Sequence, residues 1–425
     1  LAPIYDSANV ATDRNQLTME AMKRIANRHD MVCLLHEKPF AGVNGSGKHN
    51  NWSLATDTGV NLLSPGNNPQ ENTQFLIFLA AIIEAVDTYA PLLRMSAASA
   101  GNDHRLGGHE APPAVISIYL GKELTNVLEK ISKGEVIQNK AGEKFQMGVS
   151  ALPALPKDAT DRNRTSPFAF TINKFEFRMV ASSQSIAGPN VVLNTTVADI
   201  LSKYADRLEK ATDVNAEATA IVKDCYKNHN RIIFDGNGYG AEWLPEAEKR
   251  GLLNLRNTVE AVPELTKDYS VELFTKHKVF TKAELEARKS IYLEVYSQQI
   301  NIEGNLTAEM AIKSIVPAVS EYISTLANSV MDLKAILPNA NTTGQEKLIA
   351  TLSEELSGMM SAVDTLNVAL AKAQGQDDLL TQATTYSTDV INAMKVVRAH
   401  GDKLETLTDK DVWPFPTYEE LLFKL

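Results

Sequence analysis

The sequence predicts an α+β fold followed by a C-terminal helical bundle. One stretch alternates in character, because charged residues at Lys174, Glu176 and Arg178 are separated by apolar ones, as in a strand with one buried face. Elsewhere apolar residues recur at helical spacing over long stretches. Beyond Gly304 the composition changes to Ala, Leu, Ser, Thr and Glu, and only helical patterns follow. We therefore expect a mixed domain and then a helical one.

The first elements lead into a glycine-rich loop. A Thr-Asp pair that suits an N-cap precedes apolar residues at helical spacing, which predicts an amphipathic helix over 16–28. The apolar run 31–36 is predicted as a strand that delivers the chain to the loop 42–53. The residues that follow His49 are expected to form a short strand and then a turn.

The glycine-rich loop is not a Walker A phosphate loop. Residues 42–48 fit the spacing G-x-x-x-x-G-K, but His49 stands where that loop needs a Ser or Thr hydroxyl, and no helix pattern follows directly. Glycines allow backbone amides to approach an anion closely, and an imidazole can bind a metal. Residue types alone leave a phosphate or metal site and a plain glycine turn about equally open.

The middle of the chain contains a second candidate loop. Residues 73–95 are predicted as a long buried helix, and the polar segment 102–110 then places two glycines before Glu110. Glycines beside a carboxylate suit a loop that closes over a substrate, while a solvated turn is the alternative. A helix is expected over 114–133, followed by a loop-rich segment.

The strand over 173–179 has two distinct faces. Phe175 and Phe177 are expected in the core, whereas the three charged residues are expected to face a cleft. A half-exposed strand with surface ion pairs is the alternative.

The rest of the chain is predicted to be mainly helical. Helices are expected over 191–210 and 216–227, and the glycine-rich turn 235–240 is interpreted as structural, since no strand and helix of the dinucleotide-binding type flank it. The C-terminal part is predicted as an antiparallel bundle with an assembly or docking role. Its three helical patterns are 307–336, 344–373 and 377–404.

Composition excludes several classes of partner. A formal charge of −10 and a pI near 5.4 argue against a nucleic acid or an anionic membrane, since both need a basic face. Cys33 and Cys225 are too few for a disulfide framework, so a reducing cytoplasm is expected. The longest apolar run, 75–83, is too short to span a bilayer.

Four motifs occur in an order that resembles glutamine synthetase. They are Asn44-Gly45-Ser46-Gly47-Lys48-His49 after Lys38-Pro39, Arg105-Leu106-Gly107-Gly108-His109-Glu110-Ala111-Pro112, Arg162-Asn163-Arg164-Thr165, and Phe175-Glu176-Phe177-Arg178. Together they extend across about the first half of the chain, which makes chance similarity implausible. Segments 102–107, 168–170 and 413–418 resemble the type III branch in particular.

The resemblance implies a domain organisation. Residues 1–303 would form a glutamine synthetase catalytic domain, an antiparallel sheet with helices around an active-site funnel. A branch-specific insertion would occupy about 114–160, and 304–425 would form a C-terminal helical region and tail. The family's N-terminal domain and a cluster of metal-binding glutamates would lie upstream of Leu1, so the chain is expected to lack its N-terminal part.

The resemblance also implies a set of site residues. The metal ligands for Mg²⁺ or Mn²⁺ would be His49 and Glu176. The catalytic residues would be Glu110, Arg164 and Arg178. Glutamate would be bound by Asn44, Gly45, Arg105, Arg164 and Arg178, and ATP by His49, Ser53, Lys174 and Arg164.

Three departures from the family pattern affect this assignment. Asn51 replaces a histidine expected to meet ATP phosphate, and Ala169 stands where many relatives carry an arginine. Phosphate binding is then expected to be partly redistributed, with Lys48 and the insertion as candidates. Arg105 and Glu110 are also one residue closer together than in the common bacterial pattern.

The activity implied is ATP-dependent ligation of ammonia to the γ-carboxylate of L-glutamate through γ-glutamyl phosphate. The resemblance further implies self-association into a large ring, a dodecamer of two hexamers. Two alternatives stay open. One is a γ-glutamyl-amine or polyamine ligase of the same superfamily, and the other is a non-catalytic assembly or nitrogen-sensing homologue.

Overall fold

Strand β6 (Lys174–Ala181) is central to the sheet in the computed structural model of the protein. The four strands have the order β1-β6-β5-β2, in which β1 is Gly47–Trp52, β5 is Phe168–Thr171 and β2 is Ile118–Tyr119. β6 pairs antiparallel with both neighbours, whereas β2 and β5 run parallel. The sheet is therefore mixed, and the predicted antiparallel arrangement holds for β1, β6 and β5.

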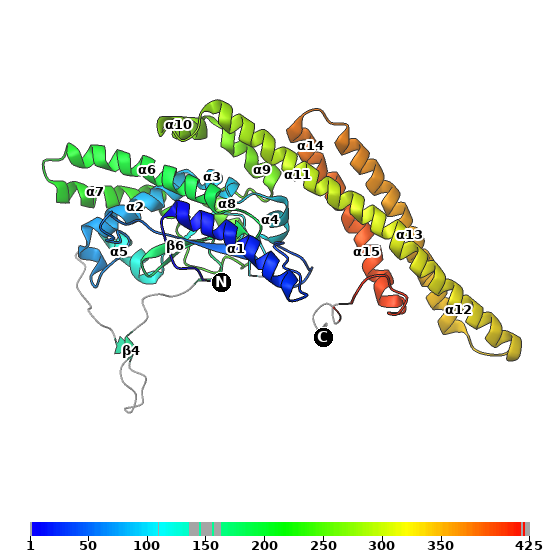
Figure 1. The fold of residues 1–425 in the computed structure, drawn as a ribbon. Coiled ribbons are helices and arrows are strands. Elements are labelled where there is room, and N and C mark those ends of the chain that lie inside the picture. The colour runs from blue at the N-terminus through cyan, green and yellow to red at the C-terminus, as the bar shows by residue number, and fades with distance from the viewer. Residues whose placement is uncertain are drawn as a thin grey trace. The chain divides into compact units, whose positions relative to one another are not determined.

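The structure describes residues 2–108, 110–135, 144–145, 155–156, 163–417 and 420. The chain divides into two compact units, Leu1–Lys289 and Ser290–Leu425 (Figure 1). The assignment of residues 1–303 and 304–425 as two domains stays a prediction. Arg162 and His109 lie outside the described residues. Of the predicted insertion at about 114–160, residues 114–135 are described, and so are the paired strands β3 (Lys144–Phe145) and β4 (Leu155–Pro156).

The apolar face of β6 forms the core, as its alternation predicts. The side chains of Phe175, Phe177 and Met179 have no exposed surface. The Phe168 ring of β5 stacks on Phe175 with the ring centroids 4.7 Å apart. Burying an aromatic side chain of this size stabilises a fold by roughly 1.5–3 kcal/mol, so this cluster fixes which face of β6 turns inward.

Three helices pack beside one another next to this sheet (Figure 1). They are α2 (Thr73–Thr88), α6 (Ala187–Glu209) and α7 (Val214–His229). Helix α6 is joined to β1 by two side-chain hydrogen bonds, from Asn50 Nδ2 to Asn190 Oδ1 at 2.9 Å and from Trp52 Nε1 to Asn194 Oδ1 at 2.8 Å. These bonds fix β1, and hence the loop before it, relative to the helical layer.

Several boundaries differ from the predicted ones for identifiable reasons. The predicted helix 73–95 is two helices, α2 and α3 (Ala90–Met95), and Pro91 in the first turn of α3 has no amide hydrogen for a continuous helix. The predicted helix 114–133 begins only at α5 (Lys122–Lys133), because β2 comes first and Gly121 has φ +83°. The N-terminal helix is longer than predicted and forms α1 (Ala8–Arg28).

The strand predicted at 31–36 is wrong. This segment is irregular, and no strand among the described residues pairs with it. Met31, Val32 and Leu34 are all more than half exposed. A β-prone sequence without a partner strand has no sheet hydrogen bonds to form, so its local propensity is not expressed.

Short elements complete the first unit. They are η1 (Pro69–Glu71), α4 (Ala100–Arg105), η2 (Asn230–Ile232), α8 (Trp243–Lys249), α9 (Thr258–Ala261), η3 (Val262–Thr266) and α10 (Asp268–Lys276). None of the described helices of the chain is long and apolar enough to cross a membrane.

The second unit is helical, as predicted. Its elements are α11 (Lys282–Met310, which begins in the first unit), the π-helical turn η4 (Ala311–Ile315), α12 (Val316–Ile336), α13 (Thr343–Gln374), α14 (Leu379–Thr385), the π-helical turn η5 (Tyr386–Val390) and α15 (Ile391–Leu407). Helix α13 packs against both α12 and α15. Chain turns at the Pro338 and Gly375 segments separate the helices, where the sequence contains helix breakers.

Candidate active site

The centre of the candidate site is a contact between β1 and β6. The register of these strands shifts between Lys48 and Asn50, which leaves His49 at a β-bulge. Its Nδ1 lies 2.7 Å from Oε1 of Glu176, a residue 127 positions away in the sequence. Bulges redirect side chains, so the irregularity and the opposing strand together bring two predicted metal ligands into contact.

Glu176 is ionised at the centre of this arrangement. Its other oxygen, Oε2, accepts hydrogen bonds from Arg178 Nε at 3.0 Å and Nη2 at 2.6 Å. Burial acts to raise the pKa of Glu176, but the hydrogen bond to His49 and the charge of Arg178 outweigh it and lower the pKa to about 2. The His49 side chain is 44% exposed against 11% for Glu176, so the carboxylate is approached from the histidine side.

The Arg178 guanidinium forms hydrogen bonds with neighbouring groups of the protein. Besides Glu176, it donates from Nη1 to the backbone carbonyls of Asn163 and Ser166. The side chain is 2% exposed. Arg178 therefore ties the 163–166 loop, which carries the exposed Arg164, to the contact between His49 and Glu176.

Arg105 is also held by protein atoms. Its Nη2 donates to the Arg178 carbonyl at 3.0 Å, and its Nη1 donates to Asn102 Oδ1 at 3.1 Å. The residue is 5% exposed. A Cβ atom at Gly47 would overlap this guanidinium, so the glycine makes the close approach possible. Arg105 therefore packs against Gly47 of β1 and the Arg178 carbonyl of β6, where it helps to hold the two strands in position.

Glu37 holds the loop before β1 in place, a role that the sequence pattern does not indicate. It is 2% exposed, and its Oε1 accepts from the backbone amide of Ser183 at 2.8 Å and from the Ser183 hydroxyl at 2.5 Å. Its own carbonyl accepts from the Ser46 amide at 2.7 Å. Cβ atoms at Gly45 and Gly101 would overlap Glu37. An acidic residue after an apolar run gave no signal of this role, since its partners are distant in sequence.

Lys48 is engaged in a structural contact. Its Nζ donates to three backbone carbonyls, those of Ala181 at 3.2 Å, Ser182 at 2.5 Å and Gln184 at 2.5 Å. Burial lowers the pKa of Lys48 to about 8, and Glu37 acts in the opposite direction. The ammonium joins β1 to the turn after β6, which leaves it poorly suited to bind phosphate as well.

The loop 102–110, which is predicted to close over a substrate, has a constrained backbone at Glu110. Glu110 has φ +67° and is exposed, and Gly107 has φ +88°. The left-handed region costs a non-glycine residue roughly 1–2 kcal/mol, which surrounding contacts must offset. The Gly107 amide donates to the Pro112 carbonyl at 3.0 Å, closing the loop at its base.

Two of the predicted nucleotide residues, Ser53 and Lys174, lie at the far end of the same strand pair. Ser53 follows β1, and its hydroxyl donates to the Asn173 carbonyl at 3.0 Å, directly before Lys174. The predicted glutamate-binding Asn44 is exposed in the loop before β1. The β1–β6 pair therefore connects both predicted ends of the site, with His49 and Glu176 between them.

The donor set of His49 and Glu176 fits part of a divalent-metal site. One imidazole nitrogen and one carboxylate are donors that suit Mn²⁺, and carboxylates suit Mg²⁺. Within the described ranges no group of three or more His, Cys, Asp or Glu residues is placed to hold a metal. Two ligands converge, and further oxygen donors would have to complete the coordination.

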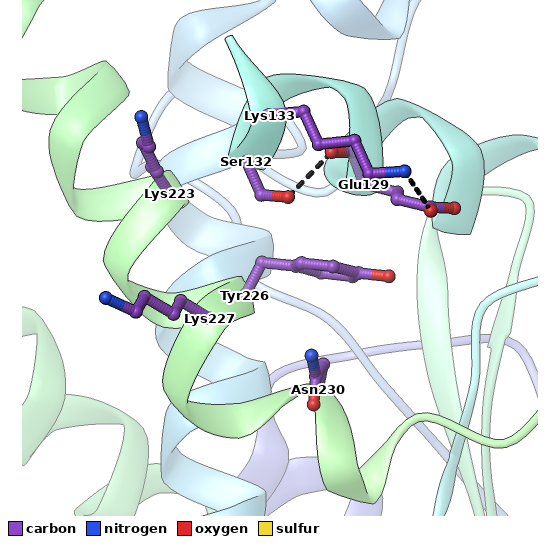
Figure 2. Close-up of a pocket in the computed structure, with 7 residues that line it drawn as sticks. All are labelled: Glu129, Ser132, Lys133, Lys223, Tyr226, Lys227 and Asn230. Atoms are coloured by element: carbon purple, nitrogen blue, oxygen red, sulfur yellow. Dashed lines mark hydrogen bonds and ion pairs between the residues drawn. The ribbon is translucent and has the colours of Figure 1, made fainter.

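A surface hollow lies elsewhere in the first unit, between α5 and α7 (Figure 2). Its volume is about 360 Å³ and it is open to solvent. Its lining is Glu129, Ser132, Lys133, Lys223, Tyr226, Lys227 and Asn230, none of which is a predicted site residue. Figure 2 shows the Tyr226 ring extending between the two helices and Lys133 paired with Glu129. Ligand pockets are mostly enclosed and lined by apolar residues. This hollow is open and its lining residues are polar.

Two family models match the chain. The model of the glutamine synthetase catalytic domain matches residues 4–117, and the model of the glutamine synthetase C-terminal domain matches residues 217–334. The catalytic-domain match includes the His49 motif and Glu110.

Curated relatives align with the whole chain. A type-3 glutamine synthetase of Dictyostelium discoideum is 43% identical over 430 residues, and a glutamine synthetase of Butyrivibrio fibrisolvens is 44% identical over 429 residues. A glutamine synthetase of Bacteroides fragilis (strain YCH46) is 38% identical over 434 residues. Each alignment covers 100% of this chain but only 58%, 61% and 60% of the respective relative.

Proposed function

The chain belongs to the glutamine synthetase family, and we propose that the protein uses ATP to join ammonia to the γ-carboxylate of L-glutamate, giving glutamine, ADP and phosphate. The observation that carries the proposal is the convergence of His49, Glu176 and Arg178. Glu176 contacts both other residues through separate oxygens, at 2.7 Å and 2.6 Å. This arrangement joins two motifs that lie far apart in the sequence.

The chemistry requires an activated carboxylate. Amide formation from ammonia and a carboxylate in water is uphill. It is also slow, because the oxygen that must leave is a poor leaving group. Transfer of the γ-phosphoryl group of ATP to the glutamate γ-carboxylate gives γ-glutamyl phosphate, from which phosphate leaves readily. The nitrogen then bonds to the acyl carbon, the carbon–oxygen bond to phosphate breaks, and one proton leaves the nitrogen.

His49 and Glu176 are proposed to hold a divalent metal, Mg²⁺ or Mn²⁺. A bound ion would neutralise charge on the nucleotide phosphates and so favour phosphoryl transfer. Glu176 is ready for this role, since its low pKa keeps it ionised at neutral pH. Arg178 keeps one oxygen of Glu176 oriented, which leaves the other oxygen on the His49 side.

Arg164 is the proposed cation for the transferred phosphoryl group. It is exposed on the loop that Arg178 anchors, and a planar guanidinium suits phosphate oxygens. Ser53 and Lys174 are proposed to contact the nucleotide at the other end of the strand pair. Arg178 and Arg105 are proposed to support the glutamate site mainly by positioning β6 and its neighbouring loops, given their internal hydrogen bonds.

Asn44 and Gly45 are proposed to bind the glutamate backbone from the loop before β1. Glu110 is proposed to close over the site, where its carboxylate would shield the acyl phosphate from water and accept a proton from the attacking nitrogen. Its exposed carboxylate at a loop closed by the Gly107 hydrogen bond supports this role.

We also propose a large ring oligomer of the family type and a cytoplasmic location. The first proposal rests on the family relationship, and the second on the two cysteines, which are both free.

The proposal is tested with the full-length protein by measuring phosphate release from ATP in the presence of glutamate and magnesium, with and without ammonium. We expect release to need both substrates. Glu176→Ala should lower the rate about 100-fold or more, because loss of a metal ligand removes several kcal/mol of charge stabilisation.

Glu309→Ala is the matched control. Glu309 is an exposed glutamate on α11 whose only described ion pair is with Lys313. The proposal is wrong if ammonium has no effect on release, or if Glu176→Ala behaves like Glu309→Ala. Turnover with larger amines but not with ammonium would identify the other ligase class.

A further inference from the structure

Arg164 is exposed, so its position depends on how the residues on either side of it are held. On the first side, the Asn163 carbonyl accepts a hydrogen bond from Nη1 of Arg178. Nη2 of the same guanidinium donates to Oε2 of Glu176 at 2.6 Å. The residue before Arg164 is therefore tied to β6 and, through Arg178, to the proposed metal ligand Glu176.

On the second side, Thr165 is held through its hydroxyl. The Thr165 Oγ1 atom accepts from the Gly238 amide at 2.7 Å and donates to Oδ1 of Asn163 at 2.6 Å. A Cβ atom at Gly238 would lie 2.9 Å from the Thr165 carbonyl oxygen, which only glycine avoids without a shift of one segment. The hydroxyl therefore joins the loop that carries Arg164 to the turn 235–240 at a point of close contact.

This turn is itself anchored beside β2. The Phe234 amide donates to the Ile118 carbonyl of β2 at 2.8 Å. The Asp235 carboxylate accepts from the backbone amides of Leu120 and Gly121, at 3.1 and 3.0 Å, where the chain leaves β2. The turn is thus a fixed support, to which a bound loop is held in a defined place.

Two other contacts between the loop and the turn do not replace the Thr165 hydroxyl. The Asn163 side-chain amide donates to the Gly236 carbonyl at 2.7 Å, but this bond holds the residue before Arg164. The Tyr239 hydroxyl lies 3.5 Å from the Arg164 carbonyl, whereas good hydroxyl-to-oxygen hydrogen bonds are about 2.5–3.0 Å long. The residue after Arg164 is therefore attached to the turn through the Thr165 hydroxyl.

We propose that Thr165 is a positioning residue of the ligase site, whose hydroxyl fixes Arg164 for its contact with the transferred phosphoryl group. This inference rests on the proposed function. A guanidinium stabilises the charge of phosphoryl transfer best when it is already in place, because no reorganisation is then needed during the reaction. The anchoring of both neighbours of Arg164, one to β6 and the other beside β2, supplies this order.

The test is Thr165→Val in the full-length protein, which keeps the shape of the side chain and removes its hydroxyl. We expect kcat for glutamine formation to fall about tenfold, since small displacements of a group that contacts the reacting atoms are costly. KM for ATP should change little, because a contact made mainly in the transition state affects kcat rather than substrate binding. Thr165→Ser keeps the hydroxyl and should restore most of the natural rate.

A double variant shows whether the effect passes through Arg164. Arg164→Ala should itself lower kcat, and Thr165→Val added to it should cause no further loss, because two residues that act through one contact are not additive. The inference is wrong if Thr165→Val lowers kcat by the same factor in both backgrounds. It is also wrong if Thr165→Ser is as slow as Thr165→Val, because the hydroxyl would then not be the group that matters.

Thr281→Val is the matched control. The Thr281 hydroxyl also donates to a side-chain oxygen, Oε2 of Glu284 at 2.9 Å, and accepts from a backbone amide, that of Glu284 at 3.3 Å. This variant should leave kcat unchanged. If the natural protein makes glutamine and Thr165→Val has the same kcat as Thr281→Val, the inference fails and the proposed function stands. If the natural protein makes no glutamine, both proposals fail.

Discussion

Three glycines beside the candidate site make space for groups of the protein itself. Gly45 borders the Glu37 backbone carbonyl, Gly101 borders the Glu37 carboxylate, and Gly47 borders the Arg105 guanidinium. The glycine-rich composition predicted close approach of a ligand to the backbone, but here the closest groups belong to Glu37 and Arg105. The loop before β1 is therefore pre-organised by internal ionic groups, and ligand contacts are left to its exposed residues such as Asn44.

Lys48→Ala separates a structural role from a phosphate-binding role. Because the ammonium donates to three carbonyls between β1 and the turn after β6, we expect a lower free energy of unfolding, by about 1–3 kcal/mol, and an unchanged KM for ATP in the remaining folded enzyme. Urea unfolding and the ATP dependence of phosphate release measure the two quantities. A raised KM for ATP at unchanged stability would instead make Lys48 a phosphate ligand.

Part of the site could be predicted from the residues themselves. The alternation of β6 places Glu176 on the other face of the strand from its phenylalanines, and the His49 motif identifies β1. The convergence of His49 and Glu176 follows once β1 and β6 pair. Glu37 could not be found in this way. Its contacts with Ser183 and Ser46 are created only by the tertiary fold.

At the level of elements, the local sequence pattern predicted a strand correctly where a neighbouring strand is present to pair with it. Strand β6 forms because β1 and β5 pair with both of its edges. The segment 31–36 has similar β propensity but no paired neighbour among the described residues, and it stays irregular. Helix ends were predicted less well, since Pro91 and Gly121 act through backbone geometry within otherwise continuous apolar patterns.

A carboxylate between helices gives the first unit a pH-dependent stability. Asp199 on α6 accepts from Tyr89 at 3.0 Å, from Lys276 at 2.7 Å and from His277 at 3.0 Å, and it pairs with Lys203 at 2.9 Å. Burial acts to raise its pKa, but these partners outweigh burial and hold the pKa well below the usual range.

The sign of the effect follows from linkage. An unfolded aspartate has a pKa of about 3.9, so this stabilisation is complete above that pH and is lost as the pH falls through the lower folded-state pKa. We expect Asp199→Asn to be less stable than the natural protein at pH 7, with the difference shrinking below about pH 4. Urea unfolding at pH 7, 5, 4 and 3 measures it. A difference that stays constant over this range would show that the charge of Asp199 is not involved.

Two glycines of α13 should respond in opposite ways to substitution. A Cβ atom at Gly358 would lie 2.5 Å from Cε1 of His400, whose ring is held by Glu355 at 2.8 Å. Gly358→Ala should therefore separate α13 from α15 and lower stability by about 1–3 kcal/mol. Gly344 has no atom within 4 Å of such a Cβ, so Gly344→Ala should raise stability by up to about 1 kcal/mol. Thermal unfolding measures both, and equal shifts of Tm would refute this packing.

At the level of the whole molecule, the site is built within one compact unit. The described predicted site residues from Asn44 to Arg178 all belong to Leu1–Lys289. The helical unit Ser290–Leu425 contains none of them, which agrees with the absence of a chemical motif in its sequence. The chain spans 58–61% of the lengths of its curated relatives, so measurements of activity belong on the full-length protein.

The most direct measurement follows an oxygen atom. Glutamate labelled with ¹⁸O in its γ-carboxylate is supplied with ATP, magnesium and ammonium, and the released phosphate is analysed by mass spectrometry. If γ-glutamyl phosphate forms, one carboxylate oxygen stays with phosphorus when nitrogen displaces phosphate, so each phosphate formed with glutamine should carry one labelled oxygen. Glutamine formation with unlabelled phosphate would contradict the account, because ATP would then not have activated the glutamate carboxylate.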